Sequence, residues 1–294
     1  MRYAVVDTGS NTIRLGVYEY ENGKLKQIHN EAIFANLAGF IEDGALTEQG
    51  ILRACDALMI QKAKAGALGA NPYFFATAAI RNAKNTDEIV EKIKAQTGIT
   101  LEVLSGEDEA LLSFLGASED FPKEKSVMAD VGGGSSEIIL FEEGVMTASK
   151  SLPWGSLKAY KTFVAGKLPT KDEIKAIQEE ITKLLEETPA FSSETRKNIC
   201  IVGGGVRAAK TLAQMFLNKT ELSVSAIDCL LDIVAENPES VWRILEEKIP
   251  KRAQTIVPGL AIYSAVSHFF GGENVFVSDH GIKEGFVKMR LLQK

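Results

Sequence analysis

Two stretches of the sequence share an arrangement in which an apolar, strand-like segment ends in an aspartate and enters a loop of small residues. The first is VVDTGSNTIRLGVYE, residues 5–19, and the second is VMADVGGGSSEIILFEEG, residues 127–144. In both, another strand-like segment follows the loop. We align Asp7–Thr12 with Asp130–Ser136, with one extra glycine in the second copy. The repetition predicts two similar domains that begin with the same hairpin and face each other across a cleft.

The rest of the chain alternates strand-like and helix-like segments, which indicates an α/β architecture. Its 294 residues are enough for two domains of ordinary size. Asn22–Gly23 marks the turn after the first hairpin, and Thr47 is a plausible N-cap for the first long helix. Residues 119–125 resemble a linker between the two halves.

Composition excludes several classes of protein. The net charge of −6 is spread without long runs of one sign, which argues against non-specific nucleic-acid binding. No apolar run reaches membrane-spanning length, and Asp7 interrupts any signal-peptide pattern, so we expect a cytoplasmic protein with no membrane partner. Cys55, Cys200 and Cys229 are far apart and lack metal-ligand spacing, which predicts reduced thiols.

The two small-residue loops are candidate phosphate-binding sites. Residues Thr8–Thr12 and Gly132–Ser136 would expose converging backbone N–H groups, because glycine permits close approach. The aspartate before each loop could then bind Mg²⁺ or its water shell beside a phosphate. A tight hairpin turn is the simpler interpretation of either loop alone. Two matched copies favour phosphate binding.

A third glycine cluster, in IVGGGVRAAKTLA at residues 201–213, follows a strand and opens a helix. The spacing of a dinucleotide-binding fingerprint fails, because Ala208 stands where the last glycine would be. We therefore interpret Gly204 and Gly205 as a strand-to-helix turn that lets a helix N-terminus approach a phosphate chain.

Seven motifs occur in one order along the chain: VVDTGSNTIRLGV, TAAIRNAKN, LSGEDEALLSFLGA, MADVGGGSSEIIL, SLPWGSLKAY, IVGGGVRAAKTLA and VSDHGIKEG. Together they closely resemble the exopolyphosphatase / guanosine pentaphosphate phosphohydrolase family of the actin, sugar-kinase and Hsp70 superfamily. The resemblance implies two ribonuclease-H-like (actin-like) domains, at residues 1–120 and 126–282, around a deep cleft. A C-terminal helix at 283–294 would complete the first domain, and the length fits members without further helical domains.

The resemblance also assigns two catalytic roles. Glu109 takes the position of the family glutamate that activates or orients the attacking water. Its neighbours Glu107 and Asp108 are expected to complement the helix dipole. Arg81 matches the family arginine that faces the phosphate chain, and the alternative is a surface arginine after a buried strand.

The remaining site residues follow from the same resemblance. Asp7 and Asp130 would bind Mg²⁺, with Glu137 as a third ligand. The expected phosphate ligands are Gly9, Ser10, Asn11, Thr12, Gly132, Gly133, Gly134, Ser135, Ser136, Gly204 and Gly205.

The implied chemistry is Mg²⁺-dependent hydrolysis of a terminal phosphoanhydride in inorganic polyphosphate, in guanosine pentaphosphate, or in both. The resemblance also raises the possibility of a homodimer. The alternatives are an ATP-dependent small-molecule kinase and a non-catalytic sensor that binds guanosine tetraphosphate or pentaphosphate. Many family members have arginine and threonine where this chain has Asn36 and Val206. These departures predict a weaker hold on long polyphosphate.

Overall fold

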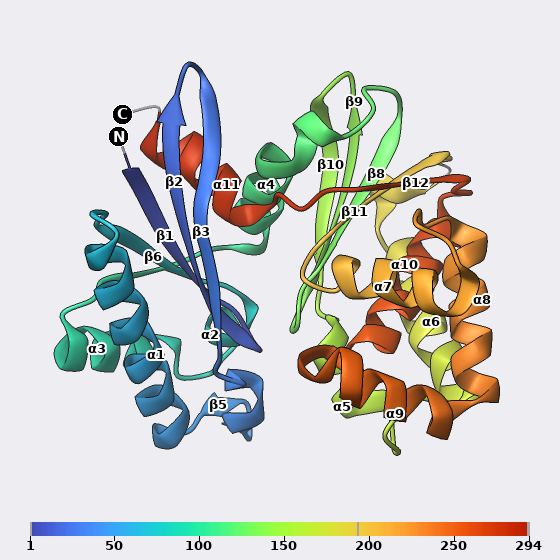
Figure 1. The fold of residues 1–294 in the computed structure, drawn as a ribbon, viewed down its shortest axis with the longest axis horizontal. Coiled ribbons are helices and arrows are strands. Elements are labelled where there is room, and N and C mark those ends of the chain that lie inside the picture. Colours follow the sequence, from blue (N-terminus) through green and yellow to red (C-terminus); the bar gives the residue numbers. More distant parts are fainter. Residues whose placement is uncertain (1, 193, 293–294) are drawn as a thin grey trace. The chain divides into compact units, whose positions relative to one another are not determined.

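The computed structural model describes residues 2–192 and 194–292, which divide into two compact units (Figure 1). Unit 1 runs from the N-terminus to Gly116 and resumes at Ile282, and unit 2 comprises Ala117–Gly281. The chain therefore passes between the units twice, at Gly116–Ala117 and at Gly281–Ile282.

Unit 1 is built on a five-stranded sheet with the order β3-β2-β1-β6-β7. The first three strands are antiparallel, and the last two run parallel to β1. The strands are β1 (Arg2–Thr8), β2 (Thr12–Glu21), β3 (Lys24–Phe34), β6 (Pro72–Ala76) and β7 (Leu101–Val103), with a separate ribbon of β4 (Ile41–Glu42) and β5 (Ala45–Leu46). The helical elements are η1 (Leu37–Phe40), α1 (Glu48–Ala67), α2 (Ala78–Arg81), α3 (Thr86–Thr97), α4 (Gly106–Ala117), α11 (Ile282–Phe286) and the π-helical turn η5 (Val287–Leu291).

Helices cover both faces of this sheet, because successive residues of β1 point to opposite sides. Val6 packs into the core that includes α1, whereas Val5 packs into a second core with α4 and α11. The N-terminus of α1 is capped as predicted, since Gly50 N donates to Thr47 Oγ1 at 3.3 Å. Asp7 follows Val5 on the face that α4 and α11 cover.

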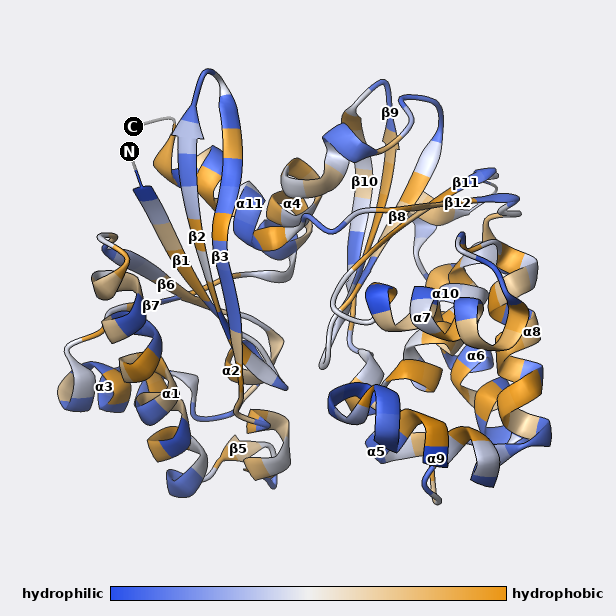
Figure 2. Ribbon diagram, viewed as in Figure 1, coloured by the Kyte–Doolittle hydropathy of each residue, from blue (hydrophilic) through white to orange (hydrophobic). Residues whose placement is uncertain are grey.

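Unit 2 repeats the arrangement with the order β10-β9-β8-β11-β12. Its strands are β8 (Ser126–Val131), β9 (Ser136–Glu142), β10 (Val145–Leu152), β11 (Asn198–Val202) and β12 (Asn274–Val277). Its helical elements are η2 (Ser118–Asp120), α5 (Ser156–Phe163), α6 (Lys171–Glu186), η3 (Pro189–Phe191), α7 (Val206–Leu217), α8 (Val224–Glu236), α9 (Pro238–Lys248), η4 (Pro250–Arg252) and α10 (Ile256–Phe269). β1 and β8, at the centres of the two sheets, are largely apolar (Figure 2).

The common strand order and directions confirm the predicted pair of ribonuclease-H-like units with duplicated hairpins. The predicted extra glycine in the second loop is wrong. Asp7 pairs with Arg14 and Asp130 pairs with Glu137, so both loops span the same number of residues. Matching the two loops by identical residues misaligned them. The strand register fixes the number of residues in each loop, whichever small residues occupy the turn.

The C-terminal segment is less regular than the single helix predicted, because α11 ends at Phe286 and a π-helical turn follows. None of the helices in residues 2–192 and 194–292 combines the length and apolar character needed to span a bilayer.

Candidate active site

The loop between β1 and β2 is fixed through its carbonyl groups. Ser10 O accepts from Ala38 N at 3.0 Å, and Asn11 O accepts from Ala35 N at 3.1 Å and from Asn36 N at 2.9 Å. In the described part of the chain, the backbone N–H groups of Ser10 and Asn11 donate to no protein acceptor. A turn with bound carbonyls and available N–H groups is an anion-binding arrangement.

The loop between β8 and β9 is held by the first turn of α5. Ser156 N and Ser156 Oγ donate to Gly132 O at 2.9 and 3.0 Å, and Leu157 N and Lys158 N donate to Gly133 O at 3.0 Å. Among residues 2–192 and 194–292, no protein group accepts from the backbone N–H of Gly133 or Gly134. Both loops therefore present backbone donors suited to phosphate oxygens.

Gly155 makes the close approach of α5 to this loop possible. A Cβ atom at Gly155 would lie 2.5 Å from Gly133 C and 2.6 Å from Gly134 N. Those atoms are backbone and cannot rotate away. The sequence motif SLPWGSLKAY therefore has a structural reason for its glycine, which the sequence alone did not explain.

The hydroxyl groups predicted as phosphate ligands have different surroundings. Ser136 Oγ donates to Trp154 O at 2.6 Å, so it braces the loop. Thr12 Oγ1 accepts from Arg14 Nε at 3.1 Å. Ser10 and Ser135 are buried within their loops. The backbone amides are thus the better-placed donors.

The strand-end aspartates differ in what lies across the hairpin. Asp130 is directly opposite Glu137, which is only 1% exposed and accepts from Ser151 Oγ at 2.8 Å. Two carboxylates in this position repel each other. Carboxylate and hydroxyl oxygens also suit a hard cation such as Mg²⁺, so the Asp130 and Glu137 pair fits the predicted metal.

Asp7 has a different neighbour, because Arg14 occupies the position that corresponds to Glu137. Unit 1 by itself is therefore a weaker site for a cation. Within the described residues there is no group of three or more His, Cys, Asp or Glu side chains suited to a metal ion. A metal would thus need ligands besides protein carboxylates, such as water or phosphate oxygens.

Glu109 and Arg81 lie together in unit 1. Glu109 is in the first turn of α4 and is 9% exposed, and Arg81 ends α2. Arg81 Nη1 lies 2.5 Å from Glu109 Oε2 and donates to Leu104 O at 3.2 Å. The guanidinium stabilises the ionised carboxylate and fixes its orientation. Sequence reasoning chose both residues but did not predict that they pair.

The other two acids of the first turn are more exposed than Glu109. Asp108 N donates to Ser105 Oγ at 3.0 Å, which caps α4, and Asp108 Oδ1 lies 3.5 Å from Arg290 Nη2. Glu107 is exposed. Only Glu109 among the three points into a protected environment.

The third glycine cluster packs against the end of β8 through Gly203. A Cβ at Gly203 would lie 2.9 Å from Val131 O and 3.1 Å from Asp130 Oδ1, and its φ of +117° favours glycine. Gly205 has open space around it. Gly203, which was not among the predicted site residues, thus lets the β11–α7 turn pass next to Asp130.

A further group of residues near Asp130 was not found from the sequence. Arg252, Thr255 and Tyr263 line a small cavity of about 10 Å³ together with Gly205 and Ser156. Burial, and then the charge of Asp130, raise the pKa of Tyr263, while Arg252 opposes them. Arg252 therefore adds a positive charge that acts on the same Tyr263 hydroxyl as the charge of Asp130. Its segment carries no periodic pattern or motif that the sequence analysis could interpret.

Comparison with known proteins places these features in a family context. Residues 17–294 match the Ppx/GppA phosphatase family. The chain is 25% identical over 309 residues to exopolyphosphatase 1 of Mycobacterium leprae, and the alignment covers 99% of this chain and 90% of that protein. It is 32% identical over 196 residues to an uncharacterized protein of Streptomyces coelicolor, covering 65% of this chain and 58% of that protein.

Two solved structures are similar along nearly the whole chain. A Ppx/GppA family member from Aquifex aeolicus has a TM-score of 0.81 and 27% identity, covering 100% of this chain and 98% of that one. An exopolyphosphatase from Cytophaga hutchinsonii has a TM-score of 0.87 and 21% identity, covering 99% of this chain and 98% of that one. At 21% identity, this second similarity shows the fold alone.

Proposed function

Because this chain belongs to the Ppx/GppA phosphatase family, we propose that it is a phosphoanhydride hydrolase that releases orthophosphate from the end of inorganic polyphosphate. The relative from Mycobacterium leprae, which matches across 99% of the chain, is named as an exopolyphosphatase. Guanosine pentaphosphate, which also ends in a phosphoanhydride, is the second substrate to test.

The observation that carries this proposal is the Glu109–Arg81 pair. A carboxylate with 9% exposure, bound to a guanidinium at 2.5 Å, is oriented before substrate arrives. Glu109 would accept a proton from the attacking water or direct its approach. Arg81 would share its donors with equatorial phosphoryl oxygens, where a bidentate cation stabilises developing charge.

The loops supply the second part of the proposed chemistry. Phosphoryl transfer needs positioning and charge stabilisation more than covalent participation. Backbone N–H groups of Ser10 and Asn11 in unit 1, and of Gly133 and Gly134 in unit 2, would bind phosphate oxygens without adding charge. The positive charge comes from side chains such as Arg81 and Arg252.

Magnesium is proposed as the cofactor. Asp130 and Glu137 would be its protein ligands, with Ser151 orienting Glu137 through the 2.8 Å hydrogen bond. Bound Mg²⁺ would neutralise phosphate oxygens and so lower the cost of charge in the transition state. The cross-strand carboxylates would in turn lose their mutual repulsion.

The test is phosphate release from polyphosphate with Mg²⁺ and without any acceptor, for wild type, Glu109→Gln and Glu107→Gln. We expect Glu109→Gln to slow release by about 10²- to 10⁴-fold, the usual contribution of a general base, with substrate binding retained. Glu107→Gln, in the same helical turn but exposed, should keep wild-type activity.

Three outcomes would contradict the proposal. Near wild-type release by Glu109→Gln would remove that residue from catalysis. Turnover only with ATP and a second substrate would indicate a kinase. Tight binding of guanosine tetraphosphate without hydrolysis of any substrate would indicate a sensor. Comparing polyphosphate with guanosine pentaphosphate at one Mg²⁺ concentration decides substrate preference.

A further inference from the structure

The two passages of the chain between its units are joined to each other by a polar cluster within unit 2. Asp120, in η2, accepts from Ser278 Oγ at 2.5 Å, and the same Oδ2 atom lies 2.8 Å from His280 Nδ1. His280 N donates to Ser278 Oγ at 3.0 Å. We call Asp120, Ser278 and His280 the connection cluster. Their side chains link segments about 160 residues apart.

The same two segments also meet in unit 1, where α4 and α11 make an unusually close contact. A Cβ at Gly285 would lie 1.8 Å from Leu112 O and 3.1 Å from Gly116 N, so only glycine fits there. Lys288 Nζ donates to Leu115 O at 3.2 Å. The end of α4 is thus held by α11 and η5 within unit 1, and the chain that directly follows it is held by the connection cluster within unit 2.

These contacts bear on Glu109 because it belongs to the same helix. Glu109 lies in the first turn of α4, and Asp120 follows the last turn. At 1.5 Å per residue, the eight residues that follow Glu109 to the end of α4 make a lever of about 12 Å, so a tilt of about 5° moves Glu109 by roughly 1 Å. Such a displacement can slow a catalysed step by up to about 10²-fold.

We propose that Asp120, Ser278 and His280 are positioning residues for the hydrolytic reaction, and that they act by fixing α4 and with it the carboxylate of Glu109. The inference rests on the proposed role of Glu109. A cluster that served stability alone would change the melting temperature without changing kcat at a temperature where the protein is folded.

The chain supplies a matched control in a second cluster of the same composition. Asp228 accepts from Ser264 Oγ at 2.7 Å and lies 2.9 Å from His268 Nε2. The side chains of Asp120 and Asp228 are equally exposed, at 36% and 35%. This helix cluster joins α8 to α10. Tyr263 near Asp130 is also on α10, but the helix cluster has no part in α4 or in the segment that follows it.

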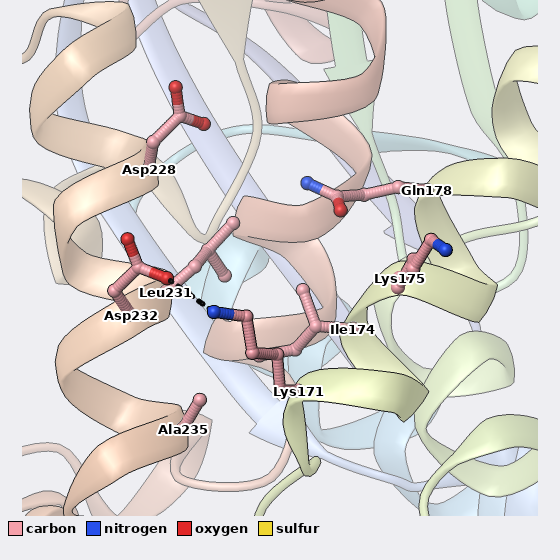
Figure 3. A pocket seen from close by; sticks show the side chains of 8 residues that line it. All are labelled: Lys171, Ile174, Lys175, Gln178, Asp228, Leu231, Asp232 and Ala235. Atoms are coloured by element: carbon pink, nitrogen blue, oxygen red, sulfur yellow. Dashed lines mark ion pairs between the residues drawn. The ribbon is translucent and has the colours of Figure 1, made fainter.

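The helix cluster lies at a cavity of about 240 Å³ between α6 and α8, where Figure 3 shows Asp228 and Gln178. Gln178 Nε2 donates to Ser264 Oγ at 2.9 Å, so the network continues into α6. Removing Asp228 should therefore disturb a partly exposed polar network of similar size that does not include α4 or η2.

The experiment compares Asp120→Ala, His280→Ala and His280→Asn with Asp228→Ala and His268→Ala in the full chain. It measures melting temperature, kcat and KM for polyphosphate, and hydrogen exchange of residues 106–117. We expect Asp120→Ala and His280→Ala to lower kcat by 5- to 30-fold, with KM within 2-fold of wild type. Amides of α4 should exchange faster. His280→Asn, whose amide nitrogen replaces the ring donor, should keep at least half of wild-type kcat.

The control variants Asp228→Ala and His268→Ala should lower the melting temperature as much as Asp120→Ala and His280→Ala do. Their kcat should stay within 2-fold of wild type, and hydrogen exchange of the α4 amides should be unchanged. The inference is overturned if Asp120→Ala and Asp228→Ala affect kcat equally at equal loss of melting temperature, or if only KM changes. If the wild-type protein releases no phosphate, the proposed function fails separately. Hydrogen exchange of residues 106–117 then tests the inference without any activity measurement. Equal exchange in Asp120→Ala and Asp228→Ala would show that the connection cluster does not fix α4.

Discussion

The two hairpins have the same backbone and opposite charges at one position. In each, the aspartate pairs with the residue seven positions later, and the loop closes by a glycine N–H donating to the carbonyl three positions later, at 3.1 Å for Gly9 and 3.0 Å for Gly132. The residue across from the aspartate is Arg14 in unit 1 and Glu137 in unit 2. The duplicated backbone provides phosphate donors twice, and the side chains make only unit 2 favourable for a cation.

The loops also differ in how they are supported. In unit 1, the segment after β3 donates from Ala35, Asn36 and Ala38, all of which carry side chains. In unit 2, α5 approaches so closely that Gly155 leaves no room for a Cβ. The second loop is therefore more tightly constrained by backbone packing, and it should be the more sensitive of the two to substitution.

Among substitutions that test the two loops, the largest effect should come from Gly155→Ala. The new methyl group would overlap backbone atoms of Gly132–Gly134 at 2.5–2.7 Å, so the loop must move. We expect phosphate release to fall by about 10²-fold through misplaced donors, with a loss of about 1–3 kcal/mol in the free energy of unfolding from overpacking. Steady-state kinetics and urea unfolding measure the two effects.

Gly39→Ala is the matched control in the segment that supports the unit 1 loop. Its methyl group would meet the Asn36 side-chain amide at 2.5 Å, and that flexible group can rotate away. We expect less than a 3-fold change in release. Equal effects of the two substitutions would show that the loops tolerate displacement equally.

The next largest effect tests the charge difference across the hairpins. Glu137→Gln removes one of two facing carboxylates, so the Mg²⁺ concentration that gives half-maximal activity should rise by about 10-fold, or roughly 1.4 kcal/mol. Arg14→Gln should leave this Mg²⁺ concentration unchanged and raise KM by a few-fold. Titrations of activity against Mg²⁺ provide the measurement. A shift of the Mg²⁺ requirement in Arg14→Gln instead would assign the cation to unit 1.

Much of this architecture could be predicted because its signals are local. Apolar strands ending at Asp7 and Asp130, followed by small residues, specify a hairpin without knowledge of the rest of the chain. The Arg81–Glu109 pair is different, because its members are separated by 28 residues and meet only through the order of β6 and β7. Sequence patterns identified both side chains and left their contact unknown.

Other features escaped prediction for identifiable reasons. Helix α10 is buried almost throughout, so its sequence lacks the periodic polar face that marks an amphipathic helix. That helix and the preceding η4 segment contribute Tyr263 and Arg252 to the small cavity that Val131 of β8 also lines. The connection cluster joins residues at the two ends of unit 2, and only the closed fold brings Asp120 and His280 together.

The smallest effect should come from making the supports of the two loops more alike. Lys158 supplies a cation on the segment that holds the unit 2 loop, although burial lowers its pKa. The corresponding support in unit 1 has the neutral Asn36, whose φ of +50° is one that asparagine adopts more readily than arginine. A new cation there would act on bound phosphates through partly screened electrostatics.

We therefore expect Asn36→Arg to lower KM for long-chain polyphosphate by about 2- to 5-fold, because an exposed charge pair contributes roughly 0.5–1 kcal/mol. The left-handed backbone should cost about 1 kcal/mol of stability. Asn36→Gln has the same backbone cost without the charge, and it should leave KM unchanged. The gain should also shrink as ionic strength rises, because salt screens an exposed charge. If Asn36→Gln lowers KM equally, the effect belongs to the loop backbone, and the missing cation does not limit binding of long chains.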